Sequence, residues 1–182
     1  MKVLAAVAVG FAVLFAWLGA TTSPKAGTKA PDLALVSPAG DKLDRDALVK
    51  DGPVVLFFVG TNCGTTAMLY KHYETMYGYL KGAGVRMYAV LDADAKTAEK
   101  YQKRQKSSIP ALLDPDQKAF TAYGLSSSPA TAVLGADGNV VKFDSGCSKS
   151  VLTDTVTSAL KLVSKTAPTT EFPDAPSSLT HG

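Results

Sequence analysis

Hydrophobic runs alternate with polar breaks containing glycine and proline along most of the chain. The run 54–59 is short, continuous and rich in valine and phenylalanine, which is typical of a strand buried on both faces. After Cys63 the apolar positions recur at helical spacing, and Gly82 and Gly84 close the helix. One face of this helix carries Leu69, Tyr73, Met76, Tyr77 and Leu80. The pattern therefore predicts a strand that leads directly into a long helix.

The same criteria predict the remaining elements. Further strands are expected at 33–36, 85–91, 109–113, 130–134 and 139–143. Further helices are expected at 44–50, 95–106, 116–123 and 148–165. Asp137 and Gly138 are a strong turn signal, so the last two strands should form a hairpin. This order predicts an α/β fold with a mixed central sheet and helices on both faces.

Both ends of the chain differ in composition from the domain between them. Residues 1–22 contain Lys2 and an uncharged apolar run over 3–20, which predicts either a signal peptide or an N-terminal membrane anchor. Both alternatives place the domain, residues 23–165, in the periplasm or another extracytoplasmic space, where two thiols can persist as a disulfide. Residues 166–182 are rich in proline, serine and threonine, and we expect a disordered tail there.

Composition and charge argue against several classes of function. The net charge is +3 and the 19 lysines and arginines are scattered, so we expect no nucleic-acid partner. Two cysteines and two histidines are too few for an autonomous structural zinc site. We therefore expect neither a metal nor an organic cofactor.

The junction between strand and long helix carries the candidate nucleophile. The Cys63 thiol should face unpaired backbone N–H groups and the positive end of the helix dipole. Both favour the thiolate, which is the reactive form of cysteine. A second cysteine three positions later would make a dithiol redox site, but Thr66 stands there. The Thr66 hydroxyl is expected either to donate a hydrogen bond to the thiolate or to act as a local cap.

Four segments resemble, in the right order, the exported thioredoxin-like redoxins of the TlpA-like and peroxiredoxin-like AhpC/TSA group. They are residues 58–63, 89–92, 123–131 and 137–138. The resemblance extends over residues 27–165 and implies a thioredoxin-like fold. It also implies that Pro129 follows a cis peptide bond from Ser128 and forms part of a substrate groove beside Cys63.

The candidate site departs from both patterns of this group. The dithiol pattern has tryptophan and cysteine where this chain has Asn62 and Thr66. The peroxiredoxin pattern has proline and threonine where this chain has Leu56 and Gly60, and it needs an arginine beside the thiolate. Of the three arginines, Arg86 begins its strand and is expected at the opposite end of the sheet. The peroxidase hypothesis therefore lacks its activating groups.

Cys147 is the second cysteine of the chain and follows the last hairpin strand. The resemblance implies that this strand returns to the edge of the sheet that holds Cys63. The two Cα atoms are then expected about 4–12 Å apart. Cys147 would either resolve a mixed disulfide formed by Cys63, or pair with it permanently in a disulfide worth about 2–4 kcal/mol. A third alternative leaves both cysteines unpaired.

The predicted function is thiol–disulfide redox chemistry on protein or small-molecule thiols and disulfides. Cys63 is the attacking thiolate, and Cys147 is its resolving or disulfide partner. Contacts to substrate are assigned to Asn62, Thr66, Ser128 and Pro129. The alternative is a non-catalytic binding module that assembles with an envelope protein, which would explain the missing motif residues together. A one-cysteine peroxidase is the third hypothesis.

Aromatic residues are dense on the long helix. Tyr73 and Tyr77 are expected in the core, whereas Tyr70 and Tyr79 are expected to form an exposed contact surface. His72 is expected to be a solvated helix residue.

Overall fold

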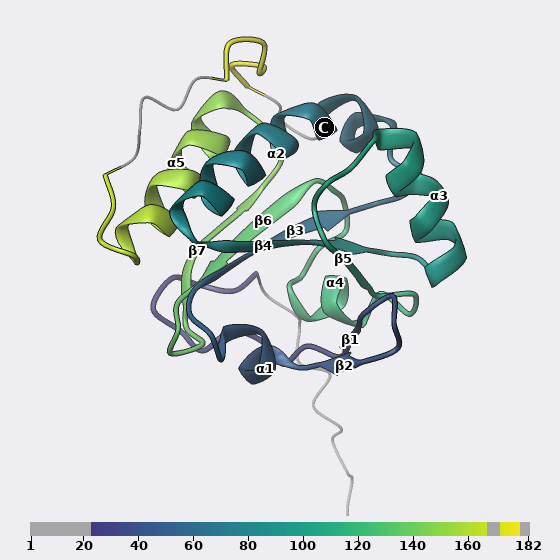
Figure 1. Cartoon of the computed structure of the whole chain (residues 1–182), viewed down its shortest axis with the longest axis horizontal. Helices are drawn as coiled ribbons and strands as arrows, with labels where there is room; N and C mark the ends of the chain where they lie inside the picture. The colour runs from purple at the N-terminus through teal and green to yellow at the C-terminus, as the bar shows by residue number, and fades with distance from the viewer. Residues whose placement is uncertain (1–22, 167–171, 179–182) are drawn as a thin grey trace, which may run out of the picture.

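Seven strands form one mixed sheet in the order β2-β1-β5-β4-β3-β6-β7 (Figure 1). The computed structural model describes residues 23–166 and 172–178 of the chain. The strands are β1 (Leu35–Val36), β2 (Lys42–Leu43), β3 (Val54–Val59), β4 (Arg86–Leu91), β5 (Ala111–Leu113), β6 (Ala130–Leu134) and β7 (Val140–Ser145). The β3–β4 and β4–β5 pairs are parallel, and β6 and β7 add antiparallel strands. The predicted mixed sheet and thioredoxin-like fold are confirmed.

Strand β3 lies near the centre of the sheet, and all its residues are buried. Its last residue, Val59, lies opposite Leu91 of the parallel strand β4. On its other side, Phe58 lies opposite Ala130, the first residue of β6. The turn that follows β3 therefore leaves the sheet beside the loop that enters β6.

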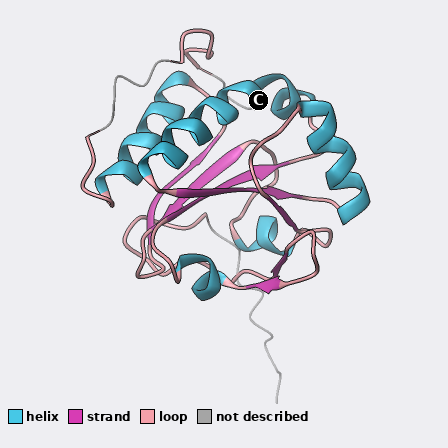
Figure 2. Ribbon diagram, viewed as in Figure 1, coloured by secondary structure: helices cyan, strands magenta, loops and turns pink. Residues whose placement is uncertain are grey.

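Helices cover both faces of the sheet, as Figure 1 and Figure 2 show. One face is covered by α2 (Gly64–Ala83), α3 (Ala95–Gln105) and α5 (Lys149–Lys161), and the other by α1 (Arg45–Val49) and α4 (Lys118–Ala122). Alternate side chains of β3 enter two separate cores, as the period of a strand requires. Phe57 enters the core under α2, where its ring stacks on Tyr73 with 3.7 Å between centroids. Phe58 enters the core under α4, where it meets Phe120.

Side-chain caps fix the starts of three helices close to their predicted positions. Asp44, Asp94 and Ser148 are the N-cap residues of α1, α3 and α5, and each side chain accepts a hydrogen bond from a backbone N–H in the first turn. Gly84 ends α2 in the left-handed conformation with φ 81°, which glycine adopts without a steric penalty.

The differences from the predicted elements lie in short or terminal segments. Strand β2 was not predicted because it has only two residues, and neither of them is buried. Helix α5 ends at Lys161 rather than at Lys165. The chain turns there because Ser164 has φ 55°, and the Lys165 N–H donates to the Leu160 carbonyl.

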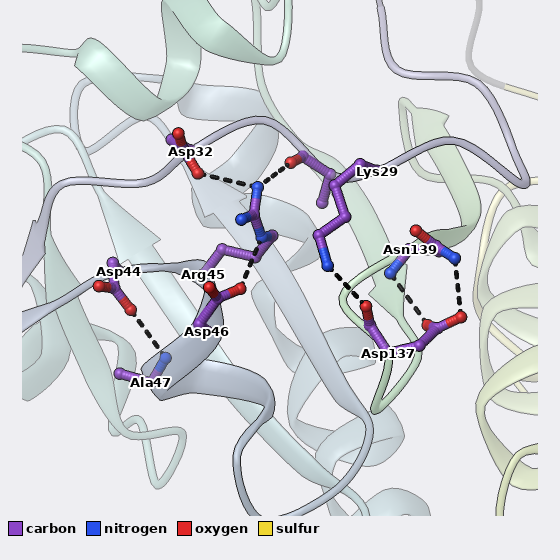
Figure 3. A network of polar contacts seen from close by, with 9 residues as sticks. Lys29, Asp32, Asp44, Arg45, Asp46, Ala47, Asp137 and Asn139 are labelled. Carbon is purple, nitrogen blue, oxygen red and sulfur yellow. Dashed lines mark hydrogen bonds and ion pairs between the residues drawn. The ribbon is translucent and has the colours of Figure 1, made fainter.

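A network of polar contacts joins the N-terminal segment to α1 and to the turn of the last hairpin (Figure 3). Arg45 donates to the Ala30 carbonyl at 2.9 Å and pairs with Asp32 at 2.8 Å. The Lys29 ammonium donates to the Asp137 carbonyl at 2.8 Å. The N-terminal segment is thereby tied both to α1 and to the turn between β6 and β7.

Two side chains of α2 are buried where the sequence predicted exposure. Tyr70 is 1% exposed, and its hydroxyl contacts the Ser107 hydroxyl at 2.9 Å, because the segment after α3 covers this side of α2. His72 is 5% exposed and interacts with Asp174 of the C-terminal segment. Both predictions were wrong because they took no account of segments distant in the sequence that cover the helix.

Residues 172–178 form a C-terminal segment that packs on the domain. The Phe172 side chain is 1% exposed and belongs to the same core as α2 and α5. Its ring lies 6.0 Å from the ring of Tyr79. The Pro176 carbonyl accepts a hydrogen bond of 2.9 Å from the N–H of Lys149, at the start of α5. This segment therefore differs from the predicted disordered tail, of which residues 167–171 and 179–182 lie outside the described residues.

The predicted signal peptide or anchor, residues 1–22, also lies outside the described residues. Within residues 23–166 and 172–178, no helix combines the length and the apolar character that a membrane span needs.

We expect Phe172→Ala to lower the free energy of unfolding by about 2 kcal/mol, as measured by urea denaturation. This is less than the roughly 3–5 kcal/mol typical of buried phenylalanines, because the segment can detach locally instead of leaving a cavity. Phe172→Leu is the control and should lose less. An unchanged urea midpoint in Phe172→Ala would contradict a contribution of the segment to stability.

Burial, reinforced by the charge of Lys71, holds the pKa of His72 below its ordinary value, while Asp174 acts in the opposite direction. The unfolded chain therefore binds this proton more readily than the folded chain. The contribution of neutral His72 to the free energy of unfolding is complete at pH values above the pKa of histidine in the unfolded chain, about 6.5. It is lost as the pH falls below that value, because protonation then favours the unfolded chain.

We therefore expect urea stability to drop between pH ~7.5 and pH ~5.5, and His72→Gln to weaken this dependence. Equal pH dependence in both proteins would show that His72 is not the titrating group.

Candidate functional site

Cys63 is the N-cap residue of α2, and its extended backbone has φ −85° and ψ 113°. Its N–H donates to the Gly60 carbonyl at 3.0 Å, which closes the turn after β3. Its own carbonyl accepts from the N–H of Ala67 at 3.1 Å, the first hydrogen bond of the helix. The side chain therefore lies over the first turn of α2, where N–H groups have no partner within the helix.

The pKa of the Cys63 thiol is lowered, although burial acts in the opposite direction. Hydrogen bonding from the side chain and N–H of Thr66, the side chain of Ser128 and the N–H of Thr65 lowers the pKa. Together they stabilise the thiolate more than burial destabilises it. In its protonated form the thiol donates to the Ser128 carbonyl, with 3.4 Å between sulfur and oxygen. The lowered pKa agrees with the expected thiolate character of Cys63, whose catalytic role stays a prediction.

The Ser128 hydroxyl is the point at which three parts of the site meet. It accepts from the N–H of Gly60 at 3.0 Å and contacts the Thr66 hydroxyl at 3.0 Å. Thr66 is fully buried, and Ser128 is 5% exposed. A Cβ atom on Gly60 would lie 2.5 Å from the Ser128 hydroxyl oxygen, so only glycine leaves room for this contact. Thr66 occupies the position of the second cysteine in a dithiol motif, and its hydroxyl points towards Ser128 in the site.

The Ser128-Pro129 peptide bond is cis, as predicted. On one side of this bond the Ser128 carbonyl faces Cys63. On the other side the Pro129 carbonyl accepts from the N–H of Gly146 at 2.7 Å. The loop therefore lies between the segments that carry the two cysteines.

A pocket of about 400 Å³ opens beside Cys63. Its lining includes Asn62, which is exposed, and Phe120 of α4. The rest of the lining comes from Gly60, Asp92, Gln117, Leu125 and residues 126–128. The assignment of Asn62, Thr66, Ser128 and Pro129 to substrate contacts stays a prediction.

Thr61, two residues before Cys63, is held from two sides. Its N–H and hydroxyl donate to one carboxylate oxygen of Asp92, at 2.7 Å and 2.8 Å. Its carbonyl accepts from the guanidinium of Arg104 in α3, at 3.4 Å. The same guanidinium lies 5.1 Å from the ring centroid of Tyr101, which is 2% exposed. An arginine therefore reaches the loop of the nucleophile, contrary to the expectation that none lies near it.

Arg104 could not be found from the sequence because α3 is rich in charged, exposed residues. The only available signal was its spacing from Tyr101: positions three apart lie on neighbouring parts of a helix surface. Arg86 behaves as predicted, since it donates to the Gly52 carbonyl before β3 begins and so lies away from Cys63.

Cys147 is completely buried in the core beneath α2 and α5. Burial raises the pKa of its thiol, although a hydrogen bond with Tyr73 acts in the opposite direction. The Tyr73 hydroxyl also donates to the Gly146 carbonyl at 3.3 Å. Both cysteines are free thiols in the structure. Their predicted Cα separation and the role of Cys147 stay predictions.

Within residues 23–166 and 172–178, the histidine, cysteine, aspartate and glutamate side chains form no cluster of three that could hold a metal ion.

Comparison with known proteins connects this geometry to a class of redox proteins. The chain is 29% identical over 140 residues to the thiol-disulfide oxidoreductase ResA of Bacillus subtilis, and the match covers 76% of this chain and 78% of that protein. The matches support the prediction of thiol–disulfide redox chemistry. They do not favour the binding-module alternative or the peroxidase alternative.

Solved structures share the fold at lower sequence identity. A putative thiol:disulfide interchange protein DsbE from Chlorobium tepidum superposes with a TM-score of 0.66 at 22% identity, covering 78% of this chain and 99% of that one. The peroxidoxin BcpB of Mycobacterium tuberculosis superposes with a TM-score of 0.62 at 18% identity, covering 78% and 97%. Because both kinds of protein share this architecture, the fold alone does not select the chemistry.

The AhpC/TSA family model matches residues 26–143, a segment that includes β3, Cys63 and the loop to Pro129. The match covers more than half of the chain, and it agrees with the sheet order and with the position of the thiol at the start of α2. The chain therefore belongs to the AhpC/TSA family.

Proposed function

We propose that this protein carries out thiol–disulfide exchange through Cys63. The observation that carries the proposal is the group of donors around the Cys63 sulfur, the hydroxyls of Thr66 and Ser128 and the first N–H groups of α2, which lowers the pKa of the thiol. Thiolate is the nucleophile in this reaction. The sulfur lies beside an open pocket, so a substrate can reach it.

In the first step the Cys63 thiolate attacks one sulfur of a substrate disulfide. A bond forms between Cys63 and that sulfur, the substrate S–S bond breaks, and the other sulfur leaves as a thiolate. Hydrogen bonding from Thr66 and Ser128 stabilises the negative charge of Cys63 before attack, and this stabilisation is lost as the charge moves to the leaving sulfur.

Release of the mixed disulfide needs a second thiol. Thr66 occupies the position of a local resolving cysteine, but its hydroxyl cannot form an S–S bond. The thiolate of an external thiol can attack the substrate sulfur, so that a disulfide forms between those two sulfurs, the bond to Cys63 breaks and Cys63 leaves as a thiolate. Alternatively, the Cys147 thiolate attacks the Cys63 sulfur, which gives a Cys63–Cys147 disulfide and expels the substrate as a thiolate.

The chain of contacts through the cis-proline loop supports a role for Cys147. The Cys63 sulfur lies against the Ser128 carbonyl, and the next carbonyl along the loop binds the N–H of Gly146. Burial and the raised pKa of Cys147 make its attack slow unless the segment opens locally. We propose that resolution by Cys147 is the slower route and resolution by an external thiol the faster one.

The proposed substrates are protein or small-molecule disulfides in an extracytoplasmic compartment. The apolar run over residues 3–20 supports export, with cleavage and membrane anchoring as the alternatives. An envelope protein is the proposed thiol donor, because the cytoplasmic thiol pool does not reach that compartment.

We expect Thr66→Val and Ser128→Ala each to raise the pKa of Cys63, because each variant removes a hydroxyl donor to the thiolate. The pKa is measured from the pH dependence of iodoacetamide alkylation at Cys63. Thr66→Ser keeps the hydroxyl and is the matched control, with a pKa close to that of the unmodified protein. If Thr66→Val left the pKa unchanged, the hydroxyl would not be a donor to Cys63.

Without external thiol, we expect Cys147→Ala to accumulate a mixed disulfide between Cys63 and a model disulfide, while the unmodified protein resolves it slowly. Mass spectrometry of acid-quenched samples measures both species. Cys63→Ser is the control and should form no mixed disulfide. Equal accumulation with and without Cys147 would leave external thiols as the sole route.

A Thr66→Cys variant tests the same step from the opposite direction, because it places a thiol in the position of a local resolving cysteine. It should clear the mixed disulfide at least about tenfold faster than the unmodified protein, since attack within one helical turn is strongly favoured by proximity.

A further inference from the structure

Arg104 differs from the other two arginines in its partners. Arg45 pairs with Asp32 at 2.8 Å, and Arg86 pairs with Asp51 at 3.6 Å. Among the residues that the structure describes, no carboxylate lies within ion-pair distance of Arg104. The one arginine without a carboxylate partner in this part of the chain is therefore the one beside the nucleophile loop.

The contacts of Arg104 hold its guanidinium beside that loop while the residue stays exposed. One terminal nitrogen donates to the Thr61 carbonyl at 3.4 Å. The guanidinium carbon lies 5.1 Å from the ring centroid of Tyr101, and that ring is itself held edge-on against Tyr70. A guanidinium has five N–H donors, so these contacts leave donors for a planar carboxylate.

We propose that Arg104 binds a carboxylate of the disulfide that Cys63 attacks, so that the protein prefers small disulfides carrying a carboxylate near the S–S bond. This inference rests on the proposed exchange reaction. Arg104 contacts the carbonyl of Thr61, which is two residues before Cys63, so a group bound at Arg104 lies beside the loop that carries the reacting sulfur. A small disulfide whose carboxylate lies close to its S–S bond can contact Arg104 and Cys63 at the same time.

The charges around the site are compatible with an anionic substrate. The Asp92 carboxylate lines the pocket beside Cys63, and one of its oxygens already accepts two hydrogen bonds from Thr61. The neighbouring Lys103 on α3 is paired with Glu99 at 2.7 Å. An exposed ion pair between Arg104 and a substrate carboxylate is expected to contribute about 0.2–1 kcal/mol, which corresponds to at most about a fivefold change in the rate of exchange.

The test compares two disulfide probes on the full chain. Dithiobis(nitrobenzoate) carries a carboxylate on each half, whereas dithiodipyridine is uncharged. The measured quantity is the ratio of the two rate constants for modification of Cys63, followed by absorbance and assigned by mass spectrometry. Using a ratio removes any effect of a mutation on the reactivity of the thiol itself.

We expect Arg104→Ala to lower this ratio by about three- to fivefold at low salt, and Arg104→Lys to lower it less. Lys103→Ala removes the same charge from the adjacent position and should leave the ratio unchanged. Raising the salt concentration should reduce the difference between Arg104→Ala and the unmodified protein, because exposed charges are screened.

Two outcomes would overturn the proposal. If Arg104→Ala slows both probes equally, Arg104 acts on the loop or the thiolate and not on the substrate. If Lys103→Ala lowers the ratio as much as Arg104→Ala, general charge attraction explains the preference. A Cys63 that reacts with neither probe would instead contradict the proposed exchange reaction itself.

Discussion

The position of the nucleophile depends on one buried hydroxyl. The Ser128 side chain accepts from the N–H of Gly60 and contacts Thr66, so it joins the end of β3, the first turn of α2 and the loop before β6. Gly60 has no side chain to obstruct this contact. Without the hydroxyl, a buried N–H would lose its partner at a cost of about 1–3 kcal/mol. A single oxygen atom thus contacts all three segments that define the site.

The Ser128 hydroxyl also affects the reactivity of Cys63, because it is one of the groups that lower the pKa of the thiol. Thr66 adds a second hydroxyl where related dithiol sites have a thiol. A hydroxyl stabilises a thiolate but cannot break a mixed disulfide, so in the proposed mechanism the site favours attack by Cys63 and leaves release to another thiol. The buried and poorly ionised Cys147 is consistent with this division, since it cannot compete with Cys63 for the first step.

The parts of the fold that local patterns encode were predicted well. The continuous apolar run predicted β3, and α1, α3 and α5 begin close to their predicted positions, where Asp44, Asp94 and Ser148 cap them. Contacts between distant segments were not predictable. Arg104 reaches the carbonyl of Thr61 only because α3 packs beside α2, and nothing in the sequence around either residue indicates that arrangement. The junction between β3 and α2 was enough to identify Cys63 as a candidate nucleophile. The side chains around it could be identified only from the tertiary structure.

The buried ring of Phe172 has a consequence for how the domain forms during synthesis. The layer of α2 and α5 holds a core side chain from near the end of the sequence, and the first free N–H of α5 is satisfied by a carbonyl at Pro176. Most of the sheet can assemble while the chain is still growing. This layer, however, stays incomplete until residues 172–176 have left the ribosome, because they supply a core side chain and a backbone hydrogen bond to it.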